Sequence, residues 1–88
     1  MQILVVCRPA QGGDQSEFRR FVSAEGAALR ELKERGVLSN AWTPGRPGAV
    51  LMLNVGTEDD AAAIAAALPL AAAGLITTEV IPLYPMNL

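Results

Sequence analysis

Glu25 is the residue of this sequence whose type and position point most directly to chemistry. Around it, from Asp14 to Arg35, apolar residues recur every three or four positions, which is typical of one side of a helix. At about 100° per residue, Glu25 projects into the middle of that apolar stripe, which consists of Phe18, Phe21, Val22, Leu29 and Leu32. An unpaired buried charge costs several kcal/mol, so this carboxylate should be neutralised, paired or facing a cavity.

Two interpretations of Glu25 follow from this position. In the first it is a general acid/base, because an apolar setting lets a carboxyl group carry a proton near neutral pH. In the second it is a structural carboxylate, either paired with Arg8 or another arginine or exposed by a rotation of the helix. The residues themselves leave both interpretations open.

Four further residues are candidates for substrate binding. Trp42 could form a flat wall for a planar ligand, or it could simply pack at the end of a strand. Tyr84 could donate a hydrogen bond to a ligand oxygen, even across a dimer, or make an ordinary contact in the tail. Arg8 and Arg46 are candidate carboxylate clamps, since a guanidinium suits bidentate recognition. Arg8 directly follows an apolar run and is the better candidate, whereas Arg46 lies at a loop tip where solvation is expected.

The composition excludes several kinds of site. The chain has no histidine and one cysteine, Cys7, which argues against zinc sites, Ser-His-Asp systems and internal disulfides. We interpret Cys7 as a small buried hydrophobe and expect neither a metal nor a cofactor. The net charge is −2 and the basic residues are scattered, so no nucleic-acid partner is expected. We also expect no membrane contact and a cytoplasmic location, because no signal peptide or bilayer-length apolar run is visible.

The strands and helices that position these residues can be predicted in chain order. Apolar or alternating runs predict strands over 3–7, 37–42, 49–55 and 75–83. The first predicted helix starts at a cap, Asp14, and stops at Gly36, a residue suited to the position after a helix. Thr57, with Asp60 three residues later, predicts the start of a second helix, which Pro69 ends or kinks. We expect residues 70–74 to be a connection of small residues.

The order of these elements, β-α-β-β-α-β over residues 1–88, predicts one domain of the α+β class. It is the order of a ferredoxin-like sandwich, with helices on one side of a four-stranded antiparallel sheet. Both faces of the strand 49–55 are largely apolar, whereas a sheet with one solvated face should alternate more clearly. We therefore expect a second copy of the chain to cover the face without helices.

Several short motifs in this order resemble muconolactone Δ-isomerase and its relatives in the dimeric α/β-barrel superfamily. They are the helix end A-E-x-x-x-L-x-x-L-x-x-x-G from Ala24 to Gly36, a strand ending in Trp42, the L-P-L at 68–70, and a last strand followed by Tyr84-Pro85. The resemblance covers nearly the whole chain. It implies two ferredoxin-like subunits packed sheet to sheet, and in some members larger rings of such dimers.

The resemblance also implies a function. The isomerases shift a double bond within a γ-lactone by proton transfer next to a carbonyl, and Glu25 takes the position of the glutamate that carries the proton. This chain departs from the family in having no histidine, in having Thr43 after Trp42, and in having three alanines after Leu70. We therefore expect a less polar pocket.

The leading hypothesis is thus a cofactor-independent isomerase or related enzyme for a small lactone or enolisable carbonyl compound. A first alternative is a catalytically silent homo-oligomer that binds a small ligand or serves as an assembly module. A second alternative is a cofactor-free monooxygenase, which rests on fold analogy alone.

Overall fold

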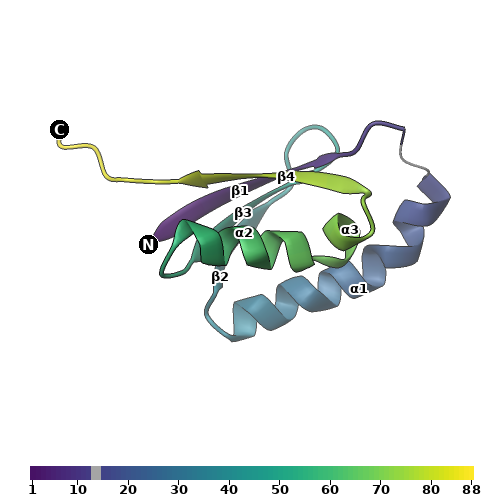
Figure 1. Ribbon diagram of the computed structural model, residues 1–88, viewed down its shortest axis with the longest axis horizontal. Helices are drawn as coiled ribbons and strands as arrows, with labels where there is room; N and C mark the ends of the chain where they lie inside the picture. The colour runs from purple at the N-terminus through teal and green to yellow at the C-terminus, as the bar shows by residue number, and fades with distance from the viewer. Residues whose placement is uncertain (13–14) are drawn as a thin grey trace.

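The computed structural model describes residues 1–12 and 15–88 of the chain. The elements run in the order β-α-β-β-α-α-β along the chain (Figure 1). They are β1 (Gln2–Pro9), α1 (Gln15–Glu34), β2 (Leu38–Trp42), β3 (Ala49–Asn54), α2 (Glu58–Ala67), α3 (Pro69–Ala72) and β4 (Ile76–Pro82).

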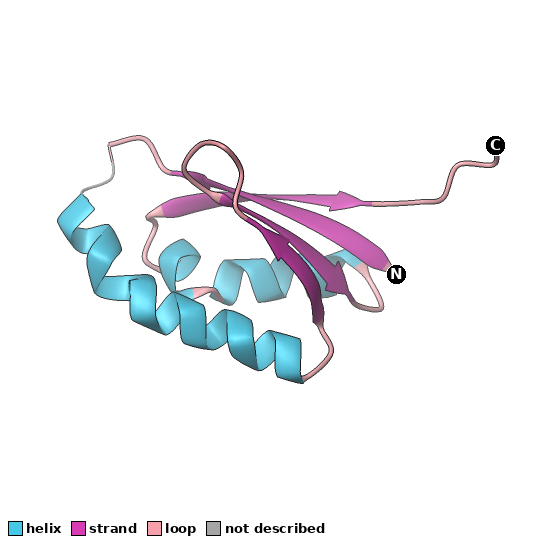
Figure 2. Ribbon diagram, turned by 180° about the vertical axis from the view of Figure 1, so that it is seen from behind, coloured by secondary structure: helices cyan, strands magenta, loops and turns pink. Residues whose placement is uncertain are grey.

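The four strands form one antiparallel sheet in the order β2-β3-β1-β4. All three helices cover the same face of this sheet, and the other face carries no helix (Figure 2). This arrangement confirms the α+β class and the ferredoxin-like topology. The sheet is open, with β2 and β4 at its two edges.

The end of α1 follows the sequence prediction closely. Gly36 adopts a positive φ of 76°, and its amide donates to the carbonyl of Lys33. The amide of Val37 donates to the carbonyl of Leu32, so the two bonds together form a Schellman motif. The predicted cap at the other end, Asp14, lies outside the described residues.

The segment after α2 differs from the prediction of a plain connection. Thr57 caps α2 as expected, with its Oγ1 accepting a hydrogen bond of 3.0 Å from the amide of Asp60. Residues 69–72, however, form the additional short helix α3. Pro69 starts α3, since proline lacks the amide that a first helical turn leaves unpaired, and Gly74 ends it with a φ of 74°. Leu70 holds this turn in place by being buried.

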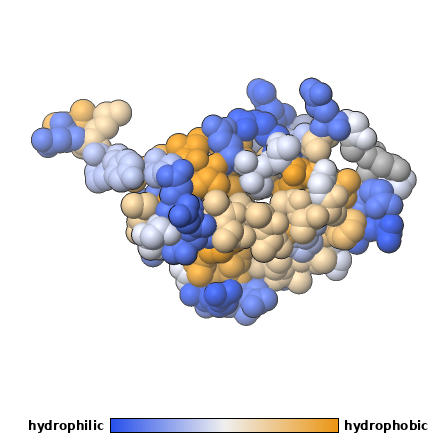
Figure 3. Space-filling view, in the orientation of Figure 1, coloured by the Kyte–Doolittle hydropathy of each residue, from blue (hydrophilic) through white to orange (hydrophobic). Residues whose placement is uncertain are grey.

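The core lies between the helices and the inner face of the sheet. Its most deeply buried large side chains are Ile3, Val5, Leu51 and Leu53, from the two central strands. Ala61 and Ala65 let α2 approach the sheet closely, and Figure 3 shows the broad, weakly apolar surface that the alanine-rich α2 leaves outside. None of the helices in the described part of the chain is long and apolar enough to cross a membrane.

Candidate functional site

A cavity of about 640 Å³ lies between α1 and one end of the sheet. It is bounded by the end of β1, the end of the β2–β3 loop, and the segment from α3 to the start of β4. Most of its wall is apolar, and the side chains that give it this character are Pro9, Phe18, Val22, Leu29, Leu75 and Ile76. Phe18 is 36% exposed and Val22 50% exposed although they belong to the apolar stripe of α1, because they face this cavity rather than the packed core.

Glu25 projects from α1 into this cavity and is half-buried. Its Oε1 accepts a hydrogen bond of 2.9 Å from the backbone amide of Leu70. Leu70 is the second residue of α3, and Leu68 at the start of that helix supplies no side-chain cap. Glu25 therefore caps α3 although it belongs to α1, and this hydrogen bond fixes the orientation of its side chain. Within the described residues, its other oxygen, Oε2, has no hydrogen-bond partner.

Cys7 lines the same cavity from the opposite wall, on β1. Its residue surface is only 4% exposed, in agreement with its interpretation as a small buried hydrophobe. Burial, and to a smaller degree the charge of Glu25, raise the pKa of the Cys7 thiol to about 11. The thiol is therefore a neutral wall of the site at physiological pH.

This raised pKa makes the stability of the protein fall at high pH. An unfolded Cys7 loses its proton around pH 9, whereas the folded one keeps it to about pH 11. Between these values the folded state binds more protons, so the free energy of unfolding should fall by about 1.4 kcal/mol per pH unit. Urea unfolding of the wild type and of Cys7→Ala at pH 7, 9, 10 and 11 measures this slope. Parallel profiles for the two proteins would contradict the assignment.

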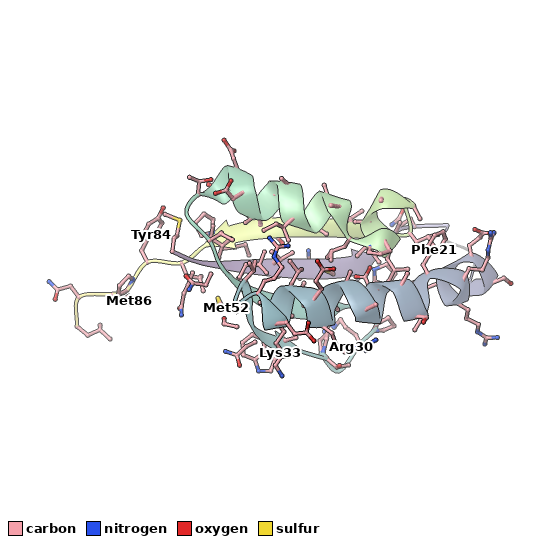
Figure 4. The ribbon with its side chains drawn as sticks, turned by 90° about the horizontal axis from the view of Figure 1, so that it is seen from below. Phe21, Arg30, Lys33, Met52, Tyr84 and Met86 are labelled. Atoms are coloured by element: carbon pink, nitrogen blue, oxygen red, sulfur yellow. The ribbon has the colours of Figure 1, made fainter. Side chains whose placement is uncertain are left out.

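The four residues predicted to bind substrate lie outside the lining of this cavity. Trp42 is 50% exposed and pairs with Val50 on the face of the sheet without helices. Arg8 projects from the same face and forms an ion pair of 3.0 Å with Glu79, not with Glu25. Tyr84, 72% exposed, lies on the C-terminal extension away from the helices (Figure 4).

Arg46 lies in the exposed loop between β2 and β3. The structure thus brings Glu25 together with none of these four residues inside one protomer. Their substrate-binding roles stay predictions.

One residue that lines the cavity lies outside the apolar stripe of α1. Arg19 falls among the polar residues of the helix in a wheel projection, yet it lines the cavity together with its neighbours Phe18 and Val22. Because Arg19 is exposed and lies outside the apolar stripe, the periodicity of the helix could not identify it. Pro47 and Gly48, from the loop interpreted only as a stiff connection, also line it.

The described residues contain no group of three or more His, Cys, Asp or Glu side chains that could hold a metal ion. Among the described lining residues, the groups available for chemistry are one carboxylate, one neutral thiol and one guanidinium.

The fold and the site together define a ferredoxin-like α+β protein with a mostly apolar cavity, into which the described residues direct one oriented carboxylate. Two solved enzyme structures share this fold. Muconolactone isomerase superposes with a TM-score of 0.78 at 18% identity, over 99% of this chain and 92% of that chain. The 5-chloro-2-hydroxyhydroquinone dehydrochlorinase TftG from Burkholderia phenoliruptrix AC1100, solved in complex with 2,5-dihydroxybenzoquinone, superposes with a TM-score of 0.73 at 20% identity, over 96% and 94%.

These likenesses confirm the resemblance to muconolactone isomerase at the level of the fold. No protein-family model and no curated protein sequence matches the chain. Any activity must therefore be argued from the residues of the cavity.

Proposed function

We propose that this protein is a cofactor-independent enzyme that transfers a proton on a small lactone or other enolisable carbonyl compound. The observation that carries the proposal is the Glu25 carboxylate, which lines a cavity of about 640 Å³ with mostly apolar walls. A general base needs a fixed geometry, and the hydrogen bond from the Leu70 amide gives Glu25 one.

In the proposed reaction, the Glu25 carboxylate removes a proton from the carbon next to the carbonyl group. The electron pair of that C–H bond moves into a new carbon–carbon double bond as the carbonyl oxygen gains negative charge. The carboxyl group then returns the proton to the far end of the conjugated system, so the double bond moves and no atom is gained or lost. Because Oε1 accepts the hydrogen bond from the Leu70 amide, Oε2 is the oxygen that carries the proton.

The two enzymes of this fold support the proposal in different ways. One is an isomerase of a lactone, and the other removes chloride from a hydroxylated ring compound, according to their names. Both names describe a small cyclic substrate, and the present cavity has room for a compound of that size. The fold alone does not specify the reaction, so the carboxylate remains the main argument.

Deuterium exchange tests the proposal without knowledge of the natural substrate. Unsaturated γ-lactones and related enolisable ketones are incubated with the protein in D₂O and followed by ¹H NMR. We expect at least one of them to lose the signal of the proton next to the carbonyl, or to shift its double bond, faster than in buffer. Exchange at the buffer rate across the whole panel would argue for the catalytically silent alternative.

We also propose that the protein forms a homodimer through the sheet face without helices. This face carries apolar side chains that are only partly covered in one protomer: Leu4, Val6, Val50, Met52 and Ile81. The exposed Trp42 extends the patch at the edge strand β2. A second copy related by a two-fold axis would bury the same patch on both chains.

Sedimentation equilibrium at micromolar concentration checks the dimer. We expect the wild type to be dimeric and Met52→Lys to be monomeric, because a lysine there would be buried between Leu4 and Asn40 with no carboxylate opposite it. Ala62→Lys is the control, since Ala62 is exposed on the helical side and its substitution should leave the dimer intact. A monomeric wild type would contradict the proposal.

A further inference from the structure

We infer that Arg19 is the anion-binding residue of the cavity, and that its substrates are small organic anions whose carboxylate contacts Arg19 while the reacting carbon lies at Glu25. This inference rests on the proposed function for the role of Glu25. It assigns a specificity-determining residue that the proton-transfer argument does not need.

The charges of the cavity point to Arg19. Among the described lining residues, only Arg19 and Glu25 carry a charge. Arg19 makes no ion pair with any described residue, whereas its neighbour Arg20 pairs with Glu17 at 2.8 Å and Arg8 pairs with Glu79. An arginine without a carboxylate partner, placed at the rim of an apolar cavity, is suited to bind a carboxylate in a bidentate manner.

The remaining arginine of the central part of α1 is directed elsewhere. A Cβ built on Gly26 would lie 3.2 Å from Nη1 of Arg30, so the Arg30 guanidinium lies along the helix surface over Gly26. Arg30 does not line the cavity. Arg19 is thus the single guanidinium among the described lining residues, and it does not compete with a second one for a bound anion.

The spacing of Arg19 and Glu25 fits one small substrate. Six positions separate them on α1, which corresponds to about 9 Å along the helix axis. This separation keeps a bound carboxylate away from the negative charge of Glu25, so the two anionic groups do not repel each other strongly. The apolar side chains of Phe18 and Val22 line the same cavity, and we expect them to contact the carbon skeleton between the two ends.

Binding of benzoate and of benzamide tests the inference without turnover. The two probes have the same ring and differ in charge, and their dissociation constants are measured by NMR titration at pH 7 and low salt. In the wild type we expect benzoate to bind at least about tenfold more tightly than benzamide, since a bidentate charged pair is lost in the amide. Arg19→Gln should abolish this preference by weakening benzoate binding and leaving benzamide binding unchanged.

Arg20→Gln is the matched control. It removes the same charge from the adjacent position, but Arg20 is already paired with Glu17, so the preference for benzoate should remain. If both variants lost the preference for benzoate equally, only the overall positive charge of the helix would matter, and the inference would be overturned. It would also be overturned if the wild type bound benzoate no better than benzamide, or if folded Arg19→Gln kept the preference.

The same titration in the Glu25→Gln background separates this inference from the proposed function. Benzoate binding should persist there, or become tighter, because a negative charge has been removed from the cavity. Catalytic activity in Glu25→Gln would disprove the role of Glu25 and leave the anion site standing. Loss of activity in Glu25→Gln, together with an Arg19→Gln variant that keeps the preference, would disprove only the anion site.

Discussion

Replacing Glu25 by glutamine is expected to lower the rate of proton transfer by about 10²- to 10⁴-fold, the usual contribution of a positioned acid/base group. A glutamine amide has nearly the same shape but cannot take a proton from carbon. The rate of deuterium exchange of the best substrate in the NMR panel measures the effect. Full activity in this variant would contradict the proposed mechanism.

The fold of this variant should be unaffected. The amide oxygen of a glutamine can still accept the hydrogen bond from the Leu70 amide that Glu25 accepts at 2.9 Å. Glu25→Ala, by contrast, leaves that amide at the start of α3 unpaired and should lower the free energy of unfolding by about 1 to 3 kcal/mol. Urea unfolding of both variants therefore separates the chemical role of the carboxylate from its structural role.

Glu34→Gln provides the matched control for the chemistry. Glu34 is an exposed residue at the end of the same helix and does not line the cavity. Its substitution removes the same charge from α1 and should leave the exchange rate unchanged. A comparable loss of activity in both variants would show that the charge of the helix, and not the position of Glu25, controls the rate.

Replacing Gly48 by alanine is expected to be the most destabilising of the small substitutions in this chain. Gly48 has a φ of 131°, and a Cβ built there would lie 2.3 Å from the carbonyl oxygen of Cys7. Strain at such a φ costs about 1 to 3 kcal/mol, and the backbone of β1 cannot move away without losing its pairing with β3. We expect a loss of about 3 kcal/mol or more in urea unfolding.

Gly45→Ala is the control within the same loop. Gly45 has no positive φ, and nothing lies within 4 Å of a Cβ built on it. Its substitution should change the free energy of unfolding by less than about 0.5 kcal/mol. A similar small change at Gly48 would mean that the loop shifts freely, and the cavity wall formed by Pro47 and Gly48 would then be adaptable rather than fixed.

Much of the fold could be predicted because its signals are local. Periodicity identified α1 and the four strands to within one or two residues at most ends, and Gly36 and Thr57 marked a helix end and a helix start through their own backbone preferences. The helix α3 was missed, since a four-residue turn of small residues has no periodicity. Only Pro69 and Gly74 indicated it, and both also occur in ordinary loops.

The candidate site was predicted only in part. Glu25 was found because a carboxylate in an apolar stripe is an anomaly along a single helix. Cys7, Arg19 and Gly48 were not, because each comes to the cavity from a different part of the chain or from the flank of the stripe. Conversely, Trp42 and Arg8 fall on the outer face of the sheet, which depends on strand register and on which face the helices cover.

The sequence by itself determined the order of the elements, the apolar character of both sheet faces and the anomaly of Glu25, since these depend on residue types at short spacing. Only the tertiary structure decided which groups surround the Glu25 side chain. It placed the amide of Leu70 at its Oε1, Cys7 across the cavity and Arg19 at the rim. These neighbours are far apart in sequence or on different sides of a helix wheel, and packing of α1 over the sheet end, not spacing along the chain, brings them together.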